Sequence, residues 1–268
     1  MQRITEPKLI LWSLAFMNIV IIGTGNVATV LGKKFKEAGH HILQVFGRDA
    51  SAASKLAYQL DTGSTNYWSV IRKDADVYII AVADDAIHEV AKHVHVPGKV
   101  VAHTAASVKK DVLKNMSHHH GVFYPLQSLR KNMKEFPGIP VFIDANDEIA
   151  KKKLEELARS MSQEKVLMAD DDKRIKMHIA AVIVSNFTNH LYKLAEDYCN
   201  KEGIEFNLLI PLIEETAKRL ETVSPSKAQT GPAIRHDEPT IQQHLVLLEK
   251  YPHLKKIYEM MTESIQGG

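Results

Sequence analysis

A short motif near the start of the chain carries the most definite chemistry in the sequence. Residues 19–32 read I-V-I-I-G-T-G-N-V-A-T-V-L-G, so a branched apolar run leads into Gly-x-Gly-x-x-Ala. Such a run is typical of a buried parallel strand. The glycines permit a tight turn close to a diphosphate, and the small third residue lets the next helix pack on the strand. The first N–H groups of that helix attract phosphate. We expect dinucleotide binding by Gly23, Thr24, Gly25, Asn26, Val27 and Ala28. The alternative is a tight turn that binds no phosphate.

A basic residue after the second predicted strand bears on the choice of coenzyme. Where such a motif binds NAD, an acidic residue about twenty positions after the glycines holds the ribose 2′-hydroxyl. Here Arg48 occupies that region, and a guanidinium can pair with a 2′-phosphate and stack on adenine. Ser51 can add a hydrogen bond, whereas Asp49 either serves a ribose or caps the next helix. We therefore predict NADP as the cofactor in preference to NAD.

Two further strand ends should lie at the same edge of the sheet, because ligands bind outside the carboxyl ends of parallel strands. At the end of the strand 76–83, we expect Ala83 and Asp84 beside the ribose on the nicotinamide side, unless Asp84 only caps a helix. The strand 99–103 ends at His103, which can act as a general acid near neutral pH or serve as a structural histidine.

A predicted helix later in the chain carries polar residues within an apolar stretch. His178, Ser185 and Asn186 are spaced i, i+7 and i+8, so they share one face of an α-helix. A buried polar group without a partner costs about 1–3 kcal/mol, so these side chains need partners. Substrate beside the nicotinamide would supply them, and so would a polar contact with another helix.

Two predicted loops supply the remaining candidate substrate ligands. Gln127 and Ser128 follow a short strand and can bond a carbonyl or carboxylate, or merely shape the turn. Arg235 follows Gly-Pro in the loop 230–237 and can clamp a carboxylate or phosphate. Asp237 can instead pair with Arg235 or cap a following helix.

The predicted elements divide the chain into two domains. In residues 1–170 strands alternate with helices, which is typical of an α/β, doubly wound, mostly parallel sheet. The expected strands are 19–22, 42–46, 76–83, 99–103, 122–124, 139–143 and 165–168, and the expected helices are 27–38, 50–58, 86–93, 108–115 and 148–161. Residues 171–268 form an all-helical C-terminal domain, with helices at 173–202, 207–222, 240–249 and 253–265.

The long helix 173–202 is apolar around much of its circumference between residues 179 and 187. A helix of this kind must be covered on several sides. Either its neighbours in the same chain or a second copy supplies that cover. We expect a homodimer that forms through the helical domain.

Composition narrows the classes of partner. A formal net charge of +2 does not favour nucleic-acid binding. Cys199 is the only cysteine, so no intrachain disulfide can form, which fits a reducing compartment. The 14 histidines include no H-E-x-x-H pattern, and we predict no metal site.

The first sixteen residues combine basic and apolar stretches in the manner of a signal peptide. They lack a good cleavage site, and their apolar part is too short to span a bilayer. We expect a cytoplasmic protein with no membrane association. We also expect translation to begin at Met17, which would make residues 1–16 an annotation extension or a short ordered arm.

Four motifs together resemble those of a family of Rossmann-like proteins labelled NADP oxidoreductases, which carry a C-terminal domain of unknown function. This family is distantly related to pyrroline-5-carboxylate reductase and the β-hydroxyacid dehydrogenases. The resemblance covers nearly everything from Met17 onward and rests on residues 23–28, 124–128, 180–186 and 230–237. It implies an NADP-binding domain followed by a helical, dimerising domain. The catalytic Lys-x-x-x-Asn of the β-hydroxyacid dehydrogenases is missing, because Lys176 lies ten residues before Asn186. That lysine mechanism does not carry over, and the resemblance supplies no substrate.

These observations lead to one principal hypothesis and one rival. The principal hypothesis is an NADP-dependent oxidoreductase that transfers hydride between nicotinamide and a small carbonyl or imine in a cleft between the domains. His103 or His178 would handle the proton, Asn186 and Gln127 would orient the substrate, and Arg235 would hold an anionic group. The rival is a non-catalytic, dinucleotide-binding sensor or regulatory dimer. A different nucleotide-like ligand is a third possibility.

Overall fold

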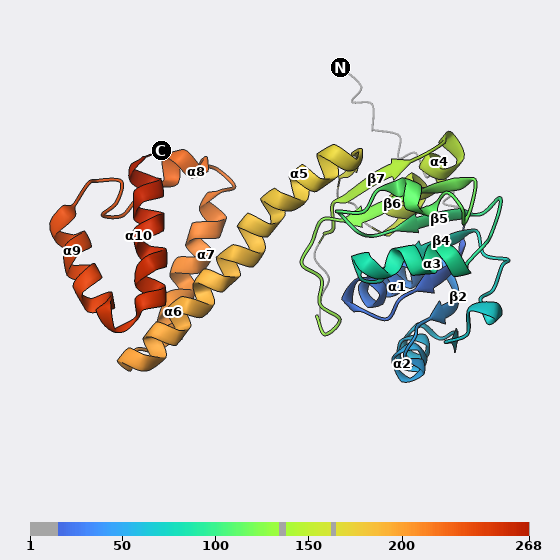
Figure 1. Cartoon of the computed structure of the whole chain (residues 1–268), viewed down its shortest axis with the longest axis horizontal. Helices are drawn as coiled ribbons and strands as arrows, with labels where there is room; N and C mark the ends of the chain where they lie inside the picture. Colours follow the sequence, from blue (N-terminus) through green and yellow to red (C-terminus); the bar gives the residue numbers. More distant parts are fainter. Residues whose placement is uncertain (1–15, 134–137, 162–164, 268) are drawn as a thin grey trace, which may run out of the picture. The chain divides into compact units, whose positions relative to one another are not determined.

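The computed structural model describes residues 16–133, 138–161 and 165–267 (Figure 1). Apart from Phe16, the expected extension at residues 1–16 lies outside these described residues. Contacts within the chain divide it into two compact units, with the division between Ser185 and Asn186.

The first unit is built on one sheet of eight strands, in the order β3-β2-β1-β4-β5-β6-β7-β8. The strands are β1 (Asn18–Ile22), β2 (His41–Phe46), β3 (Gly63–Thr65), β4 (Val77–Ile80), β5 (Val100–His103), β6 (His119–Pro125), β7 (Val141–Ala145) and β8 (Val166–Met168). All neighbouring pairs are parallel except β6 and β7. The expected α/β fold with a mostly parallel sheet is therefore confirmed.

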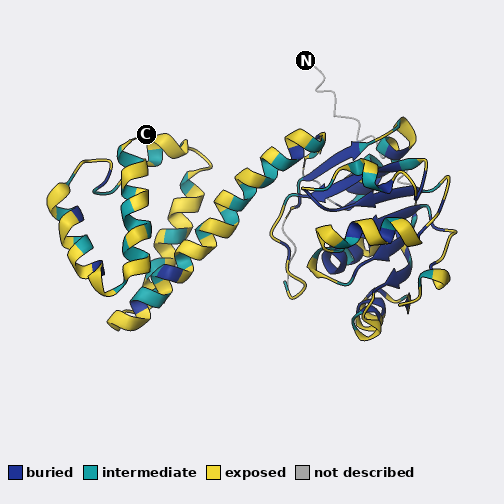
Figure 2. Ribbon diagram, in the orientation of Figure 1, coloured by how far each residue is buried: buried dark blue, intermediate teal, exposed yellow. Residues whose placement is uncertain are grey.

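Alternation along β1 explains why the sheet is covered on both faces. Ile19 and Ile21 lie in one apolar cluster, and Val20 and Ile22 lie in another. The helices α1 (Asn26–Glu37), α2 (Ala50–Leu60) and α4 (Glu148–Met161) contribute to the first cluster, whereas α3 (Ile87–His93) and the 3₁₀ turn η3 (Lys110–Leu113) contribute to the second. The central strands are mostly dark blue in Figure 2, as expected for a parallel sheet buried between helices.

Strand register places the candidate site at one edge of the sheet. Ile22 at the end of β1 pairs with Phe46 of β2 and with Ile80 of β4, and Ile80 pairs in turn with His103 of β5. The carboxyl ends of these four strands are therefore in line. Ligands bind outside this edge in open α/β sheets.

The expected single helix at 173–202 is divided into three parts. An α-helix, α5 (Asp171–Ala181), is followed by a π-helical stretch, η4 (Val182–Phe187), and by α6 (Thr188–Glu202). Hydrogen bonds in a π-helix run from i to i+5, so a spacing of 3.6 residues per turn does not apply across η4. The shared face expected for His178, Ser185 and Asn186 therefore cannot be derived from that spacing.

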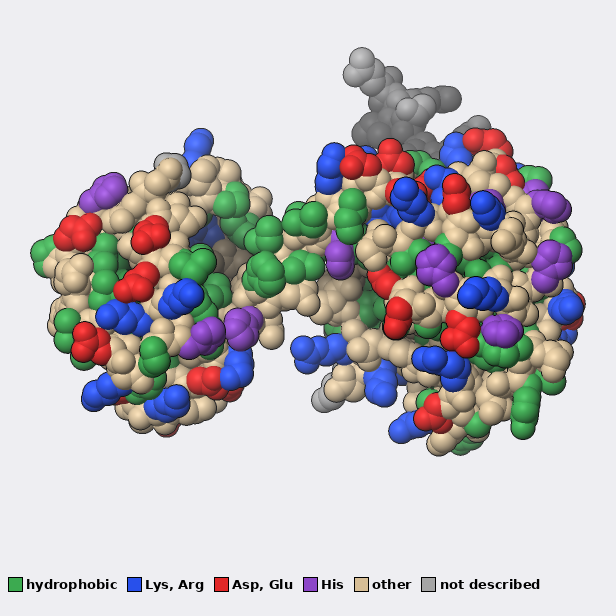
Figure 3. Space-filling view, viewed as in Figure 1, with side chains coloured by type: hydrophobic (Ala, Val, Ile, Leu, Met, Phe, Trp, Pro, Cys, Tyr) green, Lys and Arg blue, Asp and Glu red, His purple; other side chains and the backbone are tan. Residues whose placement is uncertain are grey.

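In the described part of the second unit, residues 186–267, all regular elements are helical. After α6 its elements are η5 (Phe206–Leu209), α7 (Ile210–Arg219), α8 (Pro225–Ala228), α9 (Glu238–Leu247), η6 (Leu248–Lys250) and α10 (Pro252–Gln266). Few of its apolar side chains are fully buried, and Figure 3 shows hydrophobic side chains at its surface. Exposed examples are Leu208, Leu212, Val246, Leu247 and Met260. None of the helices in the described ranges combines the length and apolar composition needed to cross a membrane.

Candidate functional site

The glycine turn between β1 and α1 is fixed by the backbone at its first glycine. Gly23 has a φ of +128°, and a Cβ there would lie 2.1 Å from the carbonyl oxygen of Ala81. Its N–H donates to the carbonyl of Phe46 at 2.8 Å. Only glycine fits this position, because both the conformation and the close approach of β4 exclude a side chain.

The second glycine of the turn is open instead of crowded. Gly25 is the N-cap of α1 with a φ of −79°, which other residues adopt without strain. Among the described residues, no heavy atom lies within 4 Å of the Cβ that this position would carry. No side chain of the described residues caps the N-terminus of α1, and the first turn of α1 holds no acidic residue. The turn therefore leaves both space and unpaired N–H groups for a phosphate.

A pocket of about 510 Å³ lies beside this turn, a volume within the usual range for ligand sites. It extends over the carboxyl ends of β1, β2 and β4 to Thr104 after β5. The sequence-predicted residues that line it are Gly23, Thr24, Gly25, Asn26, Val27, Arg48 and Ala83. Ala28 is fully buried directly after the turn. This site fits a dinucleotide, whose diphosphate would occupy the space at Gly25.

The charged residues that line this side of the pocket are Arg48, Asp49 and Glu89. Arg48 is exposed and lies 3.8 Å from the carboxylate of Glu89, a contact that is weak at a surface. Asp49 caps α2, because its carboxylate accepts hydrogen bonds from the N–H groups of Ser51 at 2.8 Å and Ala52 at 3.0 Å. Of the two alternatives for Asp49, the structure therefore favours helix capping. Arg48 remains available for a 2′-phosphate.

An aromatic stack that was not expected from the sequence also lines the pocket. Trp68, in the 3₁₀ turn η1 (Trp68–Val70), lies 4.1 Å from Phe46 and 4.9 Å from His93 between ring centroids, with nearly parallel rings. Trp68 is only partly buried and faces the same pocket as Arg48. Its sequence neighbourhood lacks a helix or strand pattern, so no local signal marks it. The part of this aromatic stack that lines the pocket, next to a guanidinium, suits contact with an adenine.

The wall beyond Ala83 is held by a pair of polar side chains. The hydroxyl of Ser107 donates a short hydrogen bond to the carboxylate of Asp84. Asp84 begins the 3₁₀ turn η2 (Asp84–Ala86), directly after the pocket residue Ala83. Asp84 therefore links the ends of β4 and β5, and it does not line the pocket itself.

His103 is enclosed, and its contacts favour the structural alternative. Its side chain is fully buried, its Nδ1 accepts from the N–H of Ala105 at 3.2 Å, and its Nε2 lies 3.4 Å from the carbonyl of Lys109. Burial, aided by the charge of Arg174, lowers the pKa of His103 to about 4. The imidazole is neutral at pH 7, and both of its nitrogens are engaged. We therefore do not retain His103 as a proton donor.

A second histidine lies against a tyrosine at the end of β6. Nδ1 of His178 is 3.0 Å from the hydroxyl of Tyr124, with the rings edge to face at 6.1 Å. His178 is partly exposed on α5, while Tyr124 is buried and its pKa is raised by that burial. Strand β6 pairs with β5, whose end reaches the pocket at Thr104. The pair therefore lies one strand beyond the pocket wall, within the first unit.

The other predicted substrate ligands have local contacts of their own. The side-chain oxygen of Gln127 accepts from the N–H of Ser128 at 2.9 Å, which shapes the turn after β6. Ser185 and Asn186 lie in the π-helical stretch η4. Arg235 lies 3.9 Å from Asp237, whose carboxylate caps α9. The roles of these residues in substrate binding stay predictions.

No metal centre is apparent in the described residues, where no three His, Cys, Asp or Glu side chains are grouped to hold an ion. Of the three consecutive histidines at 118–120, the side chains of His119 and His120 have other partners. His119 pairs with Asp147 at 2.7 Å, and Nδ1 of His120 lies 3.2 Å from the carbonyl of Ser117.

Comparisons with known proteins give two domain matches. A family described as NADP oxidoreductase, coenzyme F420-dependent, matches residues 18–107. A family described as a domain of unknown function (DUF2520) matches residues 139–265. No curated protein matches the sequence.

Solved structures extend these matches over nearly the whole chain. A Bacteroides fragilis protein provisionally named an NADP oxidoreductase is 35% identical, with a TM-score of 0.86 over 96% of this chain and 100% of that one. A reductive aminase from Aspergillus terreus, in complex with NADPH and ethyl-5-oxohexanoate, is 16% identical with a TM-score of 0.68 over 95% and 96%. A 1-pyrroline-5-carboxylate reductase from Streptococcus pyogenes is 14% identical with a TM-score of 0.63 over 94% and 99%. The last two share the fold.

Proposed function

This chain belongs to the family of Rossmann-like NADP oxidoreductases with a C-terminal DUF2520 domain, and from this premise we propose that it transfers hydride between NADP(H) and a small carbonyl or imine substrate. The observation that carries the proposal is the open space at Gly25 in the glycine turn. The backbone there does not require glycine, so the missing side chain is explained by a diphosphate. The bound nicotinamide would supply or accept the hydride.

NADP is the proposed coenzyme because of the charges at the β2 end of the pocket. Arg48 is exposed beside the pocket, and the carboxylate that could have held a ribose, Asp49, is committed to capping α2. A guanidinium forms charge-assisted hydrogen bonds with phosphate. Trp68, which is already stacked on Phe46 and His93, would contact the adenine through the part of its ring system that lines the pocket.

The proposed proton-handling group is His178 with its partner Tyr124. Histidine is the side chain that most often transfers protons in catalysis, and the hydroxyl of Tyr124, 3.0 Å from Nδ1 of His178, holds the ring in one orientation. Proton transfer to the substrate heteroatom would accompany hydride transfer to carbon. Gln127, Ser128, Ser185 and Asn186 remain proposed substrate contacts, with Arg235 for an anionic group.

Carbonyl and imine substrates are proposed by analogy with the structural relatives. Two relatives that share the fold are a reductive aminase and a pyrroline-5-carboxylate reductase. Fold alone does not define a reaction, so a reaction panel must decide between C=O and C=N. The rival proposal, a non-catalytic dinucleotide sensor, predicts coenzyme binding without turnover of any of these compounds.

We also infer a homodimer that forms through the second unit. Exposed leucines such as Leu208 and Leu212 leave apolar surface on helices that have little buried core of their own. Light scattering on the eluting protein should give twice the chain mass, and Leu212→Glu should shift it toward the monomer. Lys218→Glu, an exposed change on the same helix α7, is the matched control. A monomeric wild-type protein contradicts the inference.

The proposed function is tested by calorimetric titration with NADP⁺, NADPH, NAD⁺ and NADH. Gly25→Ala should abolish or strongly weaken binding while leaving thermal stability unchanged, because its methyl group would enter only the space of the diphosphate. Gly63→Ala is the matched control, since no described atom lies within 4 Å of its Cβ either and Gly63 does not line the pocket. Equal coenzyme binding by wild type and Gly25→Ala contradicts the proposed site.

A further inference from the structure

An arginine in the first turn of α5 is the largest fully buried side chain of the described residues. Arg174 is 1% exposed. We propose that Arg174 is a positioning residue, which fixes α5 to the loop after β5 and thereby holds His178 against Tyr124. The catalytic consequence rests on the proposed function, but the geometry does not.

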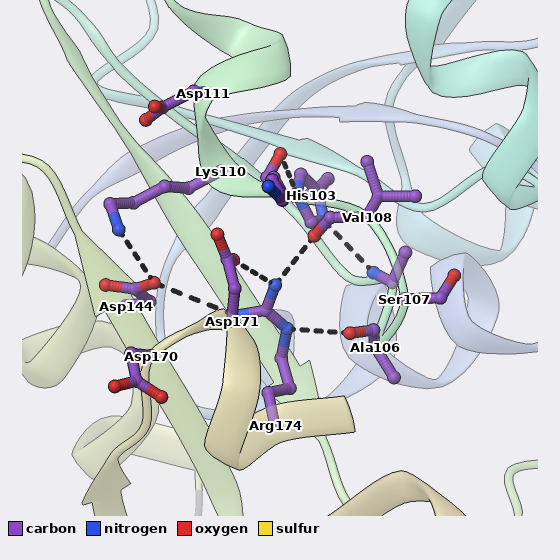
Figure 4. A network of polar contacts seen from close by, with 12 residues as sticks. His103, Ala106, Ser107, Val108, Lys110, Asp111, Asp144, Asp170, Asp171 and Arg174 are labelled. Atoms are coloured by element: carbon purple, nitrogen blue, oxygen red, sulfur yellow. Dashed lines mark hydrogen bonds and ion pairs between the residues drawn. The ribbon is translucent and has the colours of Figure 1, made fainter. Parts of the chain in front are cut away.

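The guanidinium of Arg174 joins three separate points (Figure 4). Its Nε donates to the carbonyl of Ala106 at 3.0 Å, and its Nη2 donates to the carbonyl of Val108 at 2.6 Å. Nη2 also donates to the carboxylate of Asp171 at 2.6 Å, within the same helix. Two of these acceptors are main-chain carbonyls of the loop after β5. The planar fork of an arginine can bridge them, whereas a lysine ammonium cannot reproduce that arrangement.

The charges around the guanidinium are balanced by neighbouring elements. Asp144 on β7 lies 3.7 Å from Nη1 of Arg174 and accepts from Nζ of Lys110 at 3.0 Å. With Asp171, the cluster contains two cations and two carboxylates. Nη1 has no hydrogen-bond partner among the described residues. Buried ion pairs of this kind contribute little stability compared with apolar packing, so stability alone does not account for Arg174.

Helix geometry connects this anchor to the tyrosine contact. Arg174 and His178 are four residues apart on α5, so they lie on the same face and about 6 Å apart along the axis. Fixing Arg174 therefore fixes both the rotation and the position of the helix where it carries His178. The hydroxyl that His178 contacts belongs to Tyr124, and Tyr124 lies on strand β6 of the sheet.

The anchored loop is also the wall of the coenzyme pocket. It begins at Thr104, which lines the pocket, and its Ser107 binds Asp84 next to the lining residue Ala83. Arg174 thus ties the helix that carries the proposed proton donor to the segment that borders the nicotinamide end. Met177 on α5 also packs against the apolar cluster that includes Tyr124 and Phe142, but apolar packing is non-directional and does not fix the rotation of the helix as the guanidinium does.

The test uses imidazole NMR of the full chain with isotope-labelled histidine. The ring signals of His178 are assigned from their loss in His178→Gln, and Tyr124→Phe supplies the reference position for a broken contact. Arg174→Lys and Arg174→Met should both move the His178 signals to that reference position. The matched control Lys176→Met removes a cation from the exposed face of α5, where it pairs with Asp172, and should leave them unchanged.

The outcomes separate positioning from charge and from stability. Arg174→Lys keeps the positive charge, so wild-type signals in Arg174→Lys alone would show that charge matters and would overturn the proposal. Wild-type signals in both folded variants, or failure of both to fold, would assign Arg174 a purely structural role. The readout needs no turnover. A protein that binds no NADPH would therefore refute the proposed function without deciding this result.

Discussion

Removal of the Arg48 guanidinium should weaken the binding of NADPH much more than the binding of NADH. In Arg48→Ala, NADPH loses a charge-assisted contact with its 2′-phosphate, which is worth about 1.5–3 kcal/mol for a charged hydrogen bond. Each 1.4 kcal/mol corresponds to about a tenfold change in Kd, so NADPH should bind about 10- to 150-fold more weakly. NADH has no phosphate at that position, and its Kd should change less than about twofold.

Because Arg48 is exposed and only weakly paired, its substitution should change coenzyme binding with little effect on the stability of the fold. Its side chain is 72% exposed and its ion pair with Glu89 spans 3.8 Å, so its loss should cost the fold about 0–1 kcal/mol. Glu89→Gln removes the competing carboxylate and should strengthen NADPH binding about two- to fivefold. Calorimetry with both coenzymes on wild type and both variants gives all the necessary values. Equal losses for NADPH and NADH, or no loss for NADPH, would refute the placement of the 2′-phosphate at Arg48.

Three further predictions follow from the site. His178→Gln and Tyr124→Phe should lower kcat of the identified reaction, with His178→Gln about 100- to 10,000-fold slower, while the Kd of NADPH stays unchanged in titrations; unchanged kcat in both would remove the pair from the mechanism. Because the folded-state pKa of His103 is about 4 against an ordinary 6.5, its protonation favours the unfolded chain as pH falls. Denaturant unfolding should show a loss of about 2 kcal/mol between pH 7 and pH 5 that is missing in His103→Gln, and an identical pH dependence in the two proteins would contradict the assignment. NADP⁺ should quench the fluorescence of Trp68, so the response of Trp68→Phe, which retains Trp12, should be smaller than that of wild type; equal responses in the two proteins would place the adenine elsewhere.

The nucleotide turn was predictable because its determinants are local. The run 19–22 is apolar on both faces, and the glycines follow at once, so strand, turn and helix start can be read within a few residues. The helical character of the second unit was equally clear from periodicity. Strand β3 was not predicted because its sequence, Gly-Ser-Thr, has no apolar residue and is only three residues long.

The rest of the site depends on contacts between distant segments. Trp68 acquires its position only by stacking on Phe46 and His93, which no sequence spacing indicates. Histidine is a common proton donor, but the sequence does not show that His103 is buried. That burial follows from the contacts of its ring with the backbone of Ala105 and Lys109. Tyr124 was part of a recognisable motif, but its partner is 54 residues away on α5.

The π-helical stretch shows a related limit. Residues 179–187 have an apolar pattern that an α-helix and a π-helix satisfy equally well, because both hydrogen-bond the backbone within the segment. The sequence therefore predicted one long helix, and the local change in hydrogen bonding over Val182–Phe187 was not foreseen. Ser185 and Asn186 lie inside that stretch, a kind of element that occurs frequently at functional sites.

A crystal structure of the full chain with NADPH tests the central claim most directly. We expect the diphosphate at the N-terminus of α1 over Gly25, the 2′-phosphate at Arg48 and the adenine against Trp68. A nucleotide bound elsewhere, or a glycine turn that stays empty at saturating NADPH, would contradict it.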